Sequence, residues 1–121
     1  MSPKLALNIG AVVAVIAGLG FAVAPAQLLS GFGFGAPNEA LVVTRDIGVT
    51  LIGLGILNWL ARAATGPAVR AILIGNLFIQ AAELVVNGWE IAAGMIPAQA
   101  AGGIVLHVAL GLVFLLALRR A

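Results

Sequence analysis

The sequence predicts an all-α membrane protein, with four antiparallel transmembrane helices in one bundle and both termini in the cytoplasm. Of its 121 residues, 63% are hydrophobic and only 8% are charged. The mean hydropathy is +1.20, and a soluble domain of this size could not bury so much apolar surface. Four apolar segments each approach the ~20 residues that a helix needs to cross ~30 Å of hydrocarbon. We therefore expect a single membrane-embedded domain over residues 1–121.

Helix-breaking residues separate the four segments and justify each element in turn. Ser2 and Pro3 suit the start of the first helix, and Pro25 ends it. A glycine-rich connection precedes the second helix, Pro67 begins the third, and Pro97 precedes the fourth. Because the other connections are short, sequential helices should be antiparallel neighbours. We expect helices at about 5–24, 40–61, 68–91 and 98–118.

The basic residues predict the orientation of the bundle. Five cations flank helix ends on one side: Lys4, Arg62, Arg70, Arg119 and Arg120. The other side has Glu39 and Glu90, with Arg45 as its single cation. The positive-inside rule then places both termini and the loop between the second and third helices in the cytoplasm. We expect a multi-pass protein of the bacterial cytoplasmic membrane whose basic residues contact membrane lipids. We do not expect it to bind nucleic acid.

The third helix carries a polar stripe. Its polar residues recur at steps of four, three, four and three: Asn76, Gln80, Glu83, Asn87 and Glu90. At about 100° per residue they fall within an arc of roughly 80° on one helix face. The rest of the helix is apolar, so this stripe must be hidden from lipid. Polar side chains at such depth mark a candidate functional site.

Polar residues of two other helices lie at a similar depth, in the outer half of the membrane. We expect Arg45 to pair with Glu83, while Asp46 and His107 add further donors and acceptors around a pocket open to the outer face. The alternative is structural, because polar side chains also lock membrane helices together at about 0.6–2 kcal/mol per contact. The candidate cluster comprises Arg45, Asp46, Asn76, Gln80, Glu83, Asn87 and His107.

Other chemistries find little support in the sequence. Cysteine is absent, and no Glu-x-x-His or His-x-x-x-His spacing supports a metal site. No nucleophile elbow, phosphate loop or dinucleotide fingerprint occurs, so no catalytic residue is predicted. Gly48 and Gly55 line one side of the second helix. We expect this small-residue face to dock against other membrane subunits, although a general preference for Gly and Ala codons would also explain it.

The second helix invites comparison with a known family. The run Arg45-Asp46-Ile47-Gly48, the stretch 51–62 and the end of the first helix at 20–29 resemble small bacterial DoxX-like four-helix membrane proteins. The similarity covers roughly the first half of the chain and the four-helix layout, and its motifs are mostly apolar residues and glycine. It implies the fold and topology. Some members are linked to membrane oxidoreductase systems or act as small accessory subunits. The resemblance assigns no catalytic residue here.

The leading functional prediction is a small non-enzymatic accessory subunit of a larger cytoplasmic-membrane complex, such as a transporter, with lipids as one candidate cargo. The alternative is a binding or redox module that holds a quinone or another lipophilic small molecule in an outer-leaflet pocket. A third option is a proton or ion pathway along the third helix. No cofactor is predicted, beyond the quinone or lipid that the second option would bind.

Overall fold

The computed structural model describes all 121 residues, and every regular element is a helix. Four stretches are long and apolar enough to span a membrane, which confirms the predicted all-α class with four membrane-spanning helices. Their ends differ from the predicted ones by at most two residues. The short helix α2, in the connection after the first span, was not predicted. The elements are α1 (Pro3–Val23), α2 (Pro25–Gly31), α3 (Asn38–Ala61), α4 (Gly66–Ala92), the 3₁₀ helix η1 (Ala98–Ala101) and α5 (Gly102–Leu118).

Local sequence signals define several helix ends. The Ser2 hydroxyl accepts a hydrogen bond from the Leu5 amide at 3.2 Å, and Pro3 follows as the first residue of α1. At the opposite end of the molecule, Gly33 and Gly94 adopt φ values of +80° and +70° directly after α2 and α4. Glycine adopts this left-handed conformation without steric cost, which lets the chain turn away after each helix.

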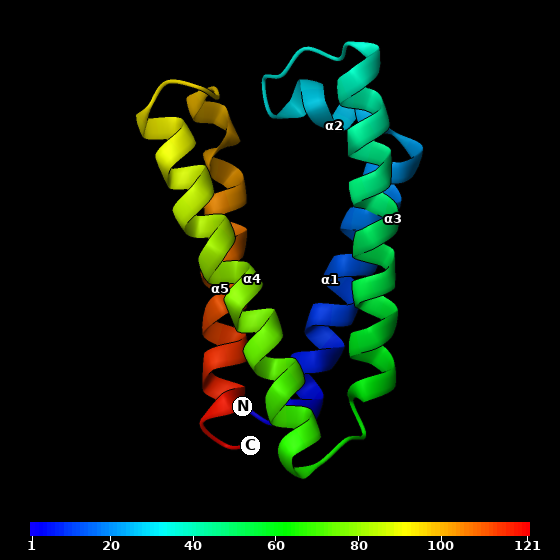
Figure 1. Cartoon of the computed structure of the whole chain (residues 1–121), viewed down its shortest axis with the longest axis vertical. Helices are drawn as coiled ribbons and strands as arrows, with labels where there is room; N and C mark the ends of the chain where they lie inside the picture. The colour runs from blue at the N-terminus through cyan, green and yellow to red at the C-terminus, as the bar shows by residue number, and fades with distance from the viewer.

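The four spans form two antiparallel pairs (Figure 1). In one pair α1 packs against α3, and in the other α4 packs against α5. The pairs meet near the end that carries both termini and the α3–α4 turn, and they diverge toward the end that carries α2 and η1 (Figure 1). We call these the closed end and the open end. The five cations that flank the helices on one side belong to the closed end.

The α1–α3 contact is close because glycine lies at the crossing. A methyl group at Gly48 would lie 2.6 Å from the Ala22 nitrogen and 2.7 Å from the Gly18 carbonyl oxygen. A methyl group at Gly55 would lie 2.9 Å from the Ala11 carbonyl oxygen. These glycines are buried inside the bundle, so the prediction that they form an external docking face was wrong. The small-residue pattern predicted close helix packing, but the partner is α1 of the same chain.

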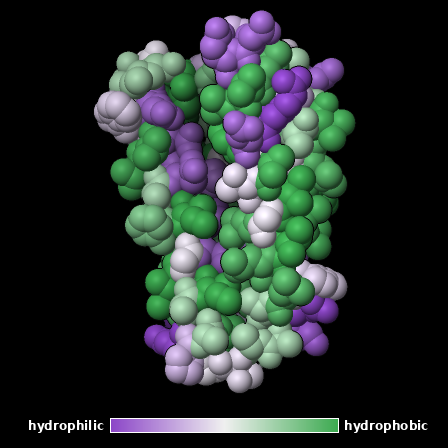
Figure 2. Space-filling view, turned by 45° about the vertical axis from the view of Figure 1, so that its right-hand side comes forward, coloured by the Kyte–Doolittle hydropathy of each residue, from purple (hydrophilic) through white to green (hydrophobic).

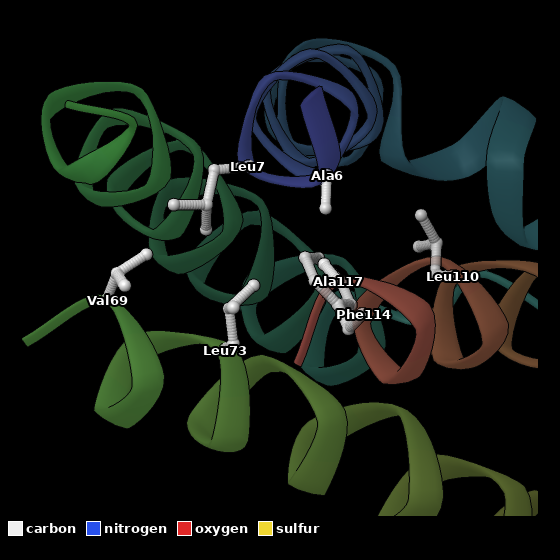
Figure 3. Packing of buried hydrophobic residues seen from close by; sticks show 7 residues of the cluster. All are labelled: Ala6, Leu7, Val69, Leu73, Leu110, Phe114 and Ala117. Atoms are coloured by element: carbon white, nitrogen blue, oxygen red, sulfur yellow. The ribbon is translucent and has the colours of Figure 1, made fainter. Parts of the chain in front are cut away.

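An apolar cluster joins the two pairs at the closed end. Its side chains come from α1, α4 and α5 and point toward one another (Figure 3). Phe114 and Leu73 are its largest members on α5 and α4, and both are fully buried together with Leu7 of α1. The cluster comprises Ala6, Leu7, Val69, Leu73, Leu110, Phe114 and Ala117. It fixes one end of the bundle and leaves the other end apart.

Candidate functional site

A cavity of about 420 Å³ lies between the diverging helix pairs. All four spans line it, together with the α2 region and the segment before α5. Most of the lining is apolar, and the polar side chains are concentrated on α4. In Figure 2, a hydrophilic strip lies in a furrow that runs between the two halves of the molecule toward the open end. The cavity is therefore accessible from the side as well as from the open end.

The polar stripe of α4 lines this cavity along its whole length. Every member of the stripe belongs to the wall: Asn76, Gln80, Glu83, Asn87 and Glu90. Asn76 and Gln80 are buried, Asn87 and Glu90 are partly exposed, and Glu83 is exposed. Exposure thus increases from the deep end of the stripe toward its middle, as expected for a furrow that widens. The four-three spacing had indicated a single buried helix face, and the structure places that face against the cavity.

The deepest polar contact is a pair of amides between α3 and α4. Asn58 donates to the Asn76 side-chain oxygen at 2.9 Å, and Asn76 donates back to the Asn58 oxygen at 2.7 Å. Asn76 also donates to the Ile72 carbonyl at 2.9 Å. Both side chains are almost fully buried, with exposed fractions of 1% and 3%. This pair crosses between the helix pairs, and its Asn76 lines the deep end of the cavity.

Asn58 was not predicted as a site residue, because its position close to the end of the second span is typical of a residue at a helix end. A signal was present, however. Asn58 follows Gly55 by three residues and Leu51 by seven, which places it on the inward face of α3. A polar side chain on the packed face of a membrane helix needs a partner. The structure supplies Asn76 as that partner.

The next polar contact joins α4 to α5. The His107 Nδ1 atom lies 2.8 Å from the Gln80 side-chain oxygen. An amide oxygen can only accept a hydrogen bond, so the His107 Nδ1 atom is the donor in this contact. Gln80 is 6% exposed. This contact locks α4 to α5 and leaves the Gln80 NH₂ group without a protein acceptor in the structure.

Glu83 has a different environment, because its side chain forms no hydrogen bond or ion pair with another helix. Asn87, one turn later on α4, donates to its carboxylate Oε2 at 2.9 Å and to its backbone carbonyl at 2.8 Å. The second carboxylate oxygen has no hydrogen-bond partner. Glu90, two turns beyond Glu83, also lines the cavity and makes no side-chain hydrogen bond. No lysine or arginine lines the cavity.

The structure does not bring Arg45 and Asp46 into the site, contrary to the sequence prediction. Both are exposed on α3 and neither lines the cavity. The inward face of α3 is set by Thr44, Ile47 and Leu51, which do line it. Successive helix positions differ by about 100°, so the two residues after Thr44 point away. The expected pair of Glu83 with Arg45 is absent. Glu83 forms no hydrogen bond with His107 either, and Asn87 is its hydrogen-bond partner instead.

The open end of the cavity carries aromatic side chains and one polar bridge. Phe32 and Phe34, which follow α2, contribute to the lining. Gln99 of η1 donates to the Gly31 carbonyl at 3.1 Å, which connects the two halves across the mouth. A methyl group at Gly33 would lie 2.7 Å from the Gln99 side chain. Glycine at this position therefore serves both the left-handed turn and the approach of Gln99.

The wall of the cavity combines apolar side chains with a few hydrogen-bonding groups. No group of three or more His, Asp or Glu side chains is positioned to hold a metal ion. In comparisons with known proteins, no family model, no curated protein and no solved structure matches this chain.

Proposed function

We propose that this protein is a membrane-embedded binding protein for an amphipathic small molecule, held in the cavity between the two helix pairs. The volume of about 420 Å³ is within the roughly 300–1,000 Å³ typical of small-molecule sites. The wall combines an apolar majority with one polar stripe. A ligand with an apolar body and a polar group fits such a lining, because each part meets atoms of its own kind.

Glu83 is the observation that carries the proposal. The Asn58–Asn76 and Gln80–His107 contacts link helices, and stabilisation of the bundle explains them. Glu83 links nothing, since its one side-chain partner lies on its own helix. A carboxylate at membrane depth is costly unless it faces a partner, water or a ligand. A structural role does not account for this residue, whereas a binding role does.

The earlier alternatives are less well supported by the described contacts. The accessory-subunit hypothesis relied on Gly48 and Gly55 as an external docking face, and α1 occupies that face. An ion pathway along α4 would need polar groups toward the closed end. There the stripe ends at Asn76, and the apolar cluster around Leu73 and Phe114 follows. The binding function is therefore our conclusion.

The cellular setting is part of the proposal. Four spans make the chain a multi-pass membrane protein, and the basic closed end argues for a cytoplasmic location of both termini. The cavity would then open toward the outer side of a bacterial cytoplasmic membrane, with lateral access from the lipid. The resemblance to DoxX-like proteins agrees with this setting and would make a quinone or a lipid one possible ligand class.

The test uses two glycines at which an added Cβ atom would meet no neighbouring atom within 4 Å. Gly103 lines the cavity, and a methyl group there has nothing within 4 Å. Gly75 has the same freedom on the exposed surface of α4 and lies outside the cavity. Gly103→Leu should fill the cavity, whereas Gly75→Leu is the matched control.

Both variants and the wild type would be purified in mild detergent, and the retained small molecules identified by native mass spectrometry. We expect the wild type and Gly75→Leu to retain a molecule that Gly103→Leu has lost, while all three keep the same helical circular-dichroism signal. Equal retention by the three proteins, or no retained molecule in any, would contradict the proposed function.

A further inference from the structure

We infer that the ligand of this cavity is a cationic amphiphile, a molecule with an apolar body and an ammonium-type group. This inference rests on the proposed function and adds the charge of the ligand. The evidence is the set of hydrogen-bond donors and acceptors in the cavity wall that have no partner within the protein. These groups are the ones that a ligand can contact.

The available acceptors include two carboxylates, beside neutral groups such as the Asn87 side-chain oxygen. One oxygen of Glu83 and both oxygens of Glu90 have no protein partner, and both residues line the cavity. The amide oxygens deeper in the stripe are already occupied, because Asn76 accepts from Asn58 and Gln80 accepts from His107. Two carboxylates thus dominate the part of the wall that a ligand can still contact.

The available donors are few and neutral. Both side-chain hydrogens of Asn87 are used by Glu83, and those of Asn76 by Asn58 and Ile72. The Gln80 NH₂ group and the Thr44 hydroxyl remain. Arg45, the nearest candidate for a cationic group in the sequence, is exposed outside the cavity. An anionic ligand would therefore meet two carboxylates and no lysine or arginine to offset them.

The apolar part of the wall agrees with a cation. Phe21, Phe32 and Phe34 all line the cavity, toward its open end. The faces of aromatic rings carry negative electrostatic potential and attract ammonium groups. A carboxylate together with aromatic rings is a common way to bind an ammonium group in a site of low polarity.

The same balance disfavours a zwitterionic phospholipid as the ligand. Its ammonium group could contact Glu83, but its phosphate needs donors or a cation, and no arginine or lysine lines the cavity. The phosphate would also lie close to Glu90 or Glu83, at an electrostatic cost. We therefore assign the site to a free cationic amphiphile rather than to the ammonium group of a bilayer lipid.

The experiment compares three probes that share one apolar tail: decyltrimethylammonium, decanol and decanoate. Binding of each radiolabelled probe would be measured by equilibrium dialysis against protein in phosphatidylcholine nanodiscs, with empty nanodiscs subtracted. We expect the cation to bind at least about tenfold more tightly than decanol, because a quaternary ammonium is attracted to a carboxylate and to aromatic faces without needing an N–H donor. Decanoate should bind more weakly than either.

Two variants test which carboxylate is responsible. Glu83→Gln keeps the shape of the side chain and removes its charge, so it should lose most of the preference for the cation and still bind decanol. Glu39→Gln is the matched control, because Glu39 is an exposed acidic residue on α3 that does not line the cavity. It should behave like the wild type.

The outcomes separate this inference from the proposed function. Equal binding of decanol and the cation by the wild type would overturn the assignment of charge and leave the binding function standing. An absence of saturable binding for all three probes, in both phosphatidylcholine and phosphatidylglycerol nanodiscs, would remove both. Repeating the titration in phosphatidylglycerol nanodiscs distinguishes the two sources of an ammonium group. Cation binding that appears only there would mean that phosphatidylcholine had occupied the site, and would overturn the assignment to a free amphiphile.

Discussion

Asn58 and Asn76 show how a single pair of side chains can hold the two halves of this bundle together. Each amide donates to the other, at 2.9 and 2.7 Å, in a position from which solvent is excluded. Neither residue has a charged or aqueous alternative at this depth. Loss of one amide would leave the other with unsatisfied polar atoms, which costs more than the net gain of a typical hydrogen bond.

We predict that Asn58→Ala and Asn76→Ala each lower the free energy of unfolding by about 1–2 kcal/mol. The double variant should lose less than the sum of the two single losses, since the second change removes the group that the first left unpaired. The free energy of unfolding of the wild type, the two single variants and the double variant would be measured in mixed detergent micelles, with circular dichroism as the readout. These four values complete a double-mutant cycle. Asn38→Ala, at an exposed position, should have little effect. Strictly additive losses would show that the two amides do not interact.

At the residue level, the sequence predicted some of the site and not the rest. The stripe on α4 was predictable, because its polar residues share one helix face and no lipid-facing arrangement could accommodate them. The roles of Arg45 and Asp46 were not predictable from depth alone. Depth follows from counting residues along a helix, but the direction of a side chain depends on how the helix is rotated. In α3 that rotation is set by the packing of Gly48 and Gly55 on α1.

At the scale of elements, the α1–α3 pair depends on the absence of side chains at its crossing. The backbone of α1 approaches Gly48 so closely that even a methyl group would collide with main-chain atoms, which cannot move aside like a flexible side chain. Gly53 of the same helix is exposed, and a methyl group there meets nothing within 4 Å. The two glycines therefore serve different purposes, although the sequence alone does not distinguish them.

We predict that Gly48→Ala destabilises the protein by about 1–3 kcal/mol, the usual cost of overpacking a close contact. Gly53→Ala should be neutral or more stable by up to about 1 kcal/mol, because alanine favours the helix over glycine. The same micelle unfolding assay compares the two. Equal stability of both variants would mean that α1 and α3 do not cross at Gly48.

The positions of the helices were easier to predict from the sequence than which helices pack against each other. Length and hydropathy fix the four spans, and helix breakers fix their ends to within two residues. The sequence does not indicate which helices pack together. In the structure α1 packs closely on α3 and α4 on α5, whereas the two pairs contact each other much less. That asymmetry follows from where small residues meet, and it creates the cavity. The short helix α2 was missed because seven residues are too few for a clear periodic pattern.

At the scale of the whole molecule, the bundle is a V with a packed closed end and a divergent open end (Figure 1). The apolar cluster and the amide pair hold the closed end, while the bridge from Gln99 to Gly31 is the hydrogen bond between the halves at the mouth. The cations gather at the closed end. The basic residues therefore lie at the end opposite the mouth of the cavity. If the basic end lies on one side of the membrane, the cavity opens toward the other side.

The last prediction tests that orientation directly. The chain contains no cysteine, so a single introduced thiol reports its own position. Gly35→Cys places one in the exposed connection at the open end, and Ala63→Cys places one in the exposed α3–α4 turn. We expect a membrane-impermeant maleimide to label Gly35→Cys in intact bacterial cells, and Ala63→Cys only after permeabilisation, because the positive-inside rule keeps the basic end in the cytoplasm. The unmodified chain controls for background labelling. The reverse pattern would place the cavity mouth on the cytoplasmic side, and the ligand would then have to be supplied from within the cell.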